Sequence, residues 1–191
     1  MKKVVLTFGL LSGLVLAVFV FVIAGLCESG TIPIEKMELV GYTTMVIALS
    51  MIFFGIKSYR DNHGGSITFW KGIQIGLLIT LIASVLYFAG AELYSLTHPG
   101  FTDRVFTKFT ELQADQMRQS GATQDQINKM IQDGRAMIEL MENPIIFFGI
   151  CLMELSPVGI IITLVSAGIL RKREVLPAPP PPDYNFKEAS S

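Results

Sequence analysis

Residues 4–26 read VVLTFGLLSGLVLAVFVFVIAGL, a run of 23 residues without a charged side chain. About 20 apolar residues in a helix are enough to cross the roughly 30 Å hydrocarbon core of a bilayer. Lys2 and Lys3 precede the run, as basic residues precede the apolar core of an export signal. The run is longer than the apolar core of such a signal, which has about 7–15 residues. It is therefore predicted to be a retained transmembrane helix.

Three further apolar runs follow, over residues 39–56, 72–91 and 145–170. The first two contain no charge, and the last contains one, Glu154. The whole chain is 51% hydrophobic and only 16% charged, which is too apolar for an ordinary soluble domain. We therefore predict an all-α, integral membrane four-helix bundle. Its first three spans lie within residues 1–94, at about 4–26, 39–56 and 72–94, and its fourth helix covers residues 144–173.

The flanks of these runs predict an orientation, because Lys and Arg are enriched on the cytoplasmic side of membrane proteins. Two lysines precede the first run, three basic residues and one acid lie between positions 57 and 71, and three basic residues follow the fourth run. The connection over residues 95–143 has 5 basic and 7 acidic residues. Both termini are therefore expected in the cytoplasm, with residues 95–143 on the opposite side.

Residues 95–143 are predicted to form an extracytoplasmic hairpin of two amphipathic helices between the third and fourth spans. Ser120 and Gly121 break the apolar periodicity between them, and Thr123 with Gln126 forms a capping-box signature. The apolar stripes are Val105, Phe109 and Leu112 in the first helix and Ile127, Met130, Ile131, Ile138 and Met141 in the second. We expect these stripes to pack on each other and on the membrane surface. A partner-binding groove is the alternative.

Residues 174–191 are predicted to be a disordered, proline-rich cytoplasmic tail, because four consecutive prolines at 179–182 favour polyproline II and cannot build a core.

Small residues recur at four-residue spacing in three of the runs, which is typical of faces where helix backbones approach closely. They are Gly9, Gly13 and Ala17 in the first run, Gly72, Gly76, Thr80 and Ser84 in the third, and Gly159, Thr163 and Ala167 in the fourth. These stripes are predicted to be packing faces within the bundle.

Glu154 is the candidate site within the membrane. It lies nine residues inside the fourth run, roughly 13 Å from its outer end. On the insertion scale a charged acid at a helix centre costs about 2.5–3.5 kcal/mol, so we expect a hydrogen bond to Tyr87 or Ser84. Glu92, near the outer end of the third span, completes this polar set. Glu154 is interpreted either as a structural polar clasp or as a proton-binding transport site.

The connection after the second run has a motif of its own, made by Lys57, Arg60, Asp61, Asn62, Gly64 and Gly65. The basic side chains can reach lipid headgroups, and the Asp-Asn and Gly-Gly pairs favour a tight turn. A phosphate-ligand site is the alternative, but neither GxxxxGK[ST] nor GxGxxG is present to support it. His63 and His98 lie at opposite membrane faces and are not expected to form a metal site.

Several of these segments resemble the domain-of-unknown-function 4199 family. The resemblance begins with residues 53–62, Gly64-Gly65 and Phe69-x-Lys71. It continues with Ser120-Gly121-Ala122, Asn143-Pro144 and Glu154-x-x-Pro157-Val158-Gly159. It implies a multi-pass inner-membrane protein of Bacteroidetes-type bacteria without an established biochemical role. No catalytic residue can be transferred from the family.

The sequence contains no HExxH, GxSxG or CxxC pattern, so we expect neither an enzyme nor a cofactor. A net charge of −1 gives no reason to expect nucleic acid. The expected partners are the lipid bilayer and either a second copy or another membrane protein. Two function classes remain: a non-catalytic structural or interaction module, and an oligomeric proton- or ion-coupled carrier or channel that uses Glu154.

Overall fold

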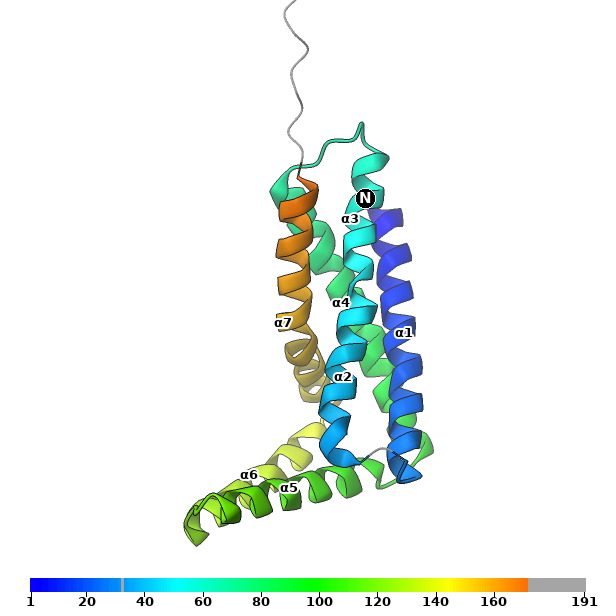
Figure 1. The fold of residues 1–191 in the computed structure, drawn as a ribbon. Coiled ribbons are helices and arrows are strands. Elements are labelled where there is room, and N and C mark those ends of the chain that lie inside the picture. Colours follow the sequence, from blue (N-terminus) through cyan, green and yellow to red (C-terminus); the bar gives the residue numbers. More distant parts are fainter. Residues whose placement is uncertain (32, 172–191) are drawn as a thin grey trace, which may run out of the picture.

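The computed structural model describes residues 1–31 and 33–171, and the predicted proline-rich tail lies outside them. The described chain is an all-α bundle (Figure 1). Its helices are α1 (Lys2–Glu28), α2 (Ile34–Leu49), α3 (Met51–Asp61), α4 (Phe69–Thr97), α5 (Phe101–Gln119), α6 (Gln124–Met141) and α7 (Pro144–Leu170).

Among the described residues, four helices are long and apolar enough to cross a membrane, which confirms the predicted fold class. They cover Lys2–Glu28, Leu39–Asp61, Phe69–Thr97 and Pro144–Leu170. The second is made of α2 and α3, which meet at Ser50 in a locally tightened turn. The Ser50 hydroxyl donates to the Ile47 carbonyl at 2.6 Å, and the Phe53 amide donates to the Ser50 carbonyl at 3.0 Å. Such bonding by a serine inside a helix often bends it, and this break was not predicted from the sequence.

The small-residue stripes hold the bundle together, which confirms the prediction that they are packing faces. α4 contacts both α1 and α7. A methyl group placed on Gly13 would lie 2.6 Å from Leu86 Cβ, and one placed on Gly72 would lie 2.8 Å from Ala167 Cβ. On Gly76 it would overlap the Thr163 side chain, and on Gly159 it would lie 2.6 Å from Thr80 Cγ2. Only glycine allows these approaches, because a side chain would occupy space that the neighbouring helix already fills.

α5 and α6 form the predicted hairpin, which leaves one end of the bundle and runs crosswise to the spanning helices (Figure 1). The N-terminus and the end of α7 lie at the opposite end. The capping box is present: Thr123 Oγ1 accepts from the Gln126 amide at 3.4 Å, and Gln126 Oε1 accepts from the Thr123 amide at 2.9 Å. α5 contacts α6, and Ala114 of α5 and Ile127 of the predicted α6 stripe are buried. The two helices of the hairpin therefore pack against each other.

Candidate functional site

Glu154 lies on α7 facing Tyr87 of α4, whose hydroxyl donates to Glu154 Oε2 at 3.2 Å. This is one of the two partners expected from the sequence. The other, Ser84, is buried and donates instead to the Thr80 carbonyl one turn earlier at 2.9 Å. Glu92 is half-buried on α4, nearer the hairpin. The structure thus brings together Glu154 and Tyr87 within the membrane-spanning part of the bundle.

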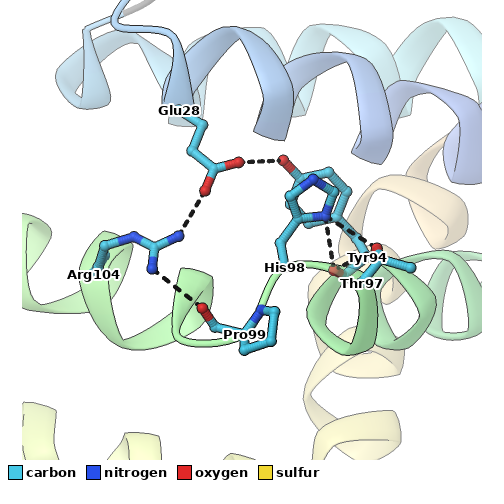
Figure 2. A network of polar contacts seen from close by, with 6 residues as sticks. All are labelled: Glu28, Tyr94, Thr97, His98, Pro99 and Arg104. Carbon is cyan, nitrogen blue, oxygen red and sulfur yellow. Dashed lines mark hydrogen bonds and ion pairs between the residues drawn. The ribbon is translucent and has the colours of Figure 1, made fainter.

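A second polar cluster lies where α1, α4 and α5 meet, at the hairpin end of the bundle (Figure 2). Glu28 Oε2 accepts from the Tyr94 hydroxyl at 3.0 Å, and Glu28 Oε1 accepts from Arg104 Nη2 at 2.6 Å. Arg104 Nη1 also donates to the Pro99 carbonyl at 3.2 Å. Glu28 therefore links the end of α1 to α4 and to the first turn of α5. We call Glu28, Tyr94 and Arg104 the corner cluster.

Local turn chemistry places Arg104 in this cluster. α4 ends at Thr97, and Gly100 then adopts φ 74°, a left-handed conformation that glycine adopts without strain. The chain turns sharply there, so α5 starts at Phe101 beneath the bundle. The Tyr94 ring is stacked on His98 with centroids 4.2 Å apart and packs edge-on against Phe21 and Phe101. The phenol is thereby held toward Glu28.

The corner cluster was not predicted from the sequence, in which no pattern singled out Glu28, Tyr94 or Arg104. Glu28 and Arg104 are 76 residues apart, so no local periodicity relates them. The one available signal was that a basic residue follows the Pro99-Gly100 turn by four positions.

We expect Arg104→Ala to loosen the hairpin from the bundle. The pair is partly exposed, with side-chain exposures of 53% for Arg104 and 33% for Glu28, so its loss should change the position of the hairpin more than the overall stability. Spin labels at Gln113 on α5 and Leu26 on α1 should give a broader distance distribution in this variant. Arg118→Ala is the matched control, because Arg118 pairs with Asp115 inside α5. Distance distributions of equal width in the two variants would contradict the idea that the Glu28–Arg104 ion pair holds the hairpin against the bundle.

A cavity of about 460 Å³ joins the two polar clusters. Its walls come from α1, α2, α4 and α7, and α5 closes it at the hairpin end. Glu154 and Tyr87 line it inside the bundle, whereas Tyr94 and Thr102 line it near the corner cluster. Glu92 and Ser84 are not among its described lining residues. The apolar stripe of α5 contributes Val105 and Phe109, so part of the hairpin stripe lines this cavity.

The motif between α3 and α4 forms a compact turn. Arg60 Nε and Nη2 donate to Asp61 Oδ1 at 3.0 and 2.9 Å, and Asn62 Nδ2 donates to the Ser58 carbonyl at 2.8 Å. Gly64 and Gly65 adopt φ 72° and 75°. Lys57 lies exposed at the end of α3. Because Arg60 and Asn62 already have partners within the turn, their arrangement fits the expected membrane-anchored turn better than a phosphate site.

Among residues 1–31 and 33–171, histidine, cysteine, aspartate and glutamate side chains do not gather in groups of three or more that could hold a metal ion. Cys27 and Cys151 are free thiols. The polar groups that line the cavity are therefore the carboxyl of Glu154, the hydroxyls of Tyr42, Thr44, Tyr87, Tyr94 and Thr102, and the Cys151 thiol.

No curated protein and no solved structure gives a significant match to this chain. Residues 7–172 match the family described as protein of unknown function (DUF4199), a match that covers every described helix almost completely. The resemblance noted in the central loop and the C-terminal half is thereby confirmed, and the chain belongs to the DUF4199 family.

Proposed function

We propose that this protein is a non-catalytic interaction module of the bacterial inner membrane, which displays its α5–α6 hairpin to another protein. The observation that carries the proposal is the hairpin itself, which runs crosswise beyond the end of the bundle (Figure 1). The ends of the hairpin helices nearest the bundle line the cavity, through Val105 and Phe109 on α5 and Met141 on α6.

The rest of the hairpin offers a surface to a partner. On α6, Met137 and Leu140 are 43% and 47% exposed. Exposed methionine is suited to binding because its unbranched side chain adapts to different apolar shapes. α6, which carries both residues, begins with a capping box, so this surface is presented on a regular helix rather than on a loose connection.

Photocrosslinking in intact cells tests this proposal. A photoreactive amino acid at Met137 or Leu140 is expected to give discrete protein adducts, and one at Leu10 of α1 is the matched control. Leu10 is similarly exposed, at 46%, but lies on a spanning helix that faces lipid. An adduct of twice the mass of the chain would identify a second copy as the partner. Absence of adducts from both hairpin positions, or the same adducts from Leu10, would contradict the proposal.

The alternative is an oligomeric carrier or channel coupled to protons or ions. The observation that favours it is that Glu154 lines a cavity within the spanning helices instead of being sealed between them. Four spans are few for a carrier that acts alone, so this alternative requires an oligomer.

Glu154→Gln tests the alternative, since the amide keeps an oxygen that can accept from Tyr87 but cannot exchange a proton. We expect its thermal stability in detergent to stay within about 1 kcal/mol of the wild type, because the hydrogen bond is retained. For a carrier, dissipation of a pH gradient in vesicles should be lost completely in this variant. Equal gradient dissipation by both proteins, or a monomeric mass in detergent, would count against transport.

A further inference from the structure

The cavity lined by Glu154 and Tyr87 contains an acidic group without a basic one among its described lining residues. Its described lining residues include one carboxyl, Glu154, and no lysine, arginine or histidine. The nearby cation of the corner cluster, Arg104, is paired with Glu28 at 2.6 Å and is not among the lining residues. A ligand inside the cavity therefore meets a single acidic group that the described residues do not neutralise with a cation.

The carboxyl has room for a ligand. Tyr87 donates to Oε2, whereas the Glu154 residue is exposed on the cavity side and Oε1 has no hydrogen-bond partner among the described residues. The volume of about 460 Å³ falls within the range of about 300–1,000 Å³ that small-molecule sites occupy. It is too large to be explained as a packing defect around one side chain.

The walls are aromatic as well as apolar. Five helices each contribute at least one aromatic ring, namely Phe19, Tyr42, Tyr87, Phe101 and Phe147. The faces of such rings carry partial negative charge and attract cations, an attraction that strengthens when water is excluded. Apolar walls at the same time select a ligand that is itself largely apolar.

We propose that the cavity between α1, α2, α4, α5 and α7 binds a lipophilic organic cation, with its single positive charge facing Glu154 and its apolar groups against the aromatic walls. Such a ligand matches the acidic group, which no described lining cation neutralises, the ring faces and the apolar lining together. A neutral acyl chain would leave Oε1 of the carboxyl without a partner, and an anion would be repelled by the carboxylate. This binding activity goes beyond an interaction module and does not depend on the hairpin having a partner.

Two ions of matched size and shape test the proposal. Tetraphenylphosphonium is the cationic probe and tetraphenylborate is its anionic counterpart. Binding of each is measured by equilibrium dialysis with the full-length protein in detergent, with binding to empty micelles subtracted. The wild type is expected to bind the phosphonium saturably, and Glu154→Gln to bind it at least tenfold more weakly. Glu139→Gln, an exposed acid on α6, is the matched control and should bind as the wild type does.

A second variant makes the result independent of the folding of Glu154→Gln. Ala91→Phe places a ring into the cavity from α4 and should also weaken phosphonium binding at least tenfold. Tetraphenylborate should bind the wild type no more tightly than it binds Glu154→Gln. Saturable binding of both ions to the wild type with equal affinity would show an apolar cleft for acyl chains and overturn the proposal. Unchanged phosphonium binding in the folded Glu154→Gln or Ala91→Phe protein would overturn it as well.

Discussion

Replacing Gly76 with leucine is expected to force α4 away from α7 and to lower the free energy of unfolding by about 1–3 kcal/mol or more. A first methyl group at this position already overlaps the side chain of Thr163, before the rest of the leucine is added. Thr163 is itself buried, so it cannot swing into open space. The two helices must therefore separate, and the contacts around Gly72 and Gly159 are weakened with them.

Gly168→Leu is the matched control, because the chemical change is the same and no atom lies within 4 Å of a methyl group placed on Gly168. Both substitutions replace a helical glycine, so both gain about 0.5–1 kcal/mol of helix propensity. The difference between the two variants in a detergent unfolding experiment thus isolates the helix contact. Equal stabilities would contradict the arrangement of α4 against α7.

The spacing of small residues predicted which faces pack because that spacing is a local property of each helix. It did not predict which faces pair. The stripes of α1 and α7 use different sides of α4: Gly13 approaches Ala83 and Leu86, whereas Gly76 and Thr80 approach Thr163 and Gly159. Nor did the apolar run over residues 39–56 reveal the tightened turn at Ser50, since a serine hydroxyl that bonds backward leaves the hydropathy of the run unchanged.

The candidate site was also predictable only in part, because a local sequence pattern does not show how the helices pair. The depth of Glu154 in its run predicted a hydroxyl partner at a similar depth on another span, and Tyr87 is that partner. Ser84 was an equally good candidate by depth. It lies on the buried side of α4, where its own helix supplies a carbonyl acceptor. The cavity and the corner cluster depend on how five helices meet, which no single helical period encodes.

Cysteine labelling is expected to give an all-or-none result for the orientation. In a protein whose Cys27 and Cys151 have been replaced, Gln124→Cys should react fully with a membrane-impermeant thiol reagent added to spheroplasts. Ser66→Cys, and Ser190→Cys in the tail outside the described residues, should react only after permeabilisation. The control is the total number of reactive thiols in detergent, which should be equal for the three variants.

The fold strengthens the charge argument that underlies this expectation. The N-terminus, the connection from α3 to α4 and the end of α7 lie together at one end of the bundle, opposite the hairpin (Figure 1). That end carries the basic residues Lys2, Lys3, Lys57, Arg60, Lys71 and Arg171. Basic residues near an anionic cytoplasmic leaflet are attracted to it, so their gathering at one end favours the predicted orientation. Labelling of Ser66→Cys but not Gln124→Cys in intact spheroplasts would invert the topology and place the proposed interaction hairpin in the cytoplasm.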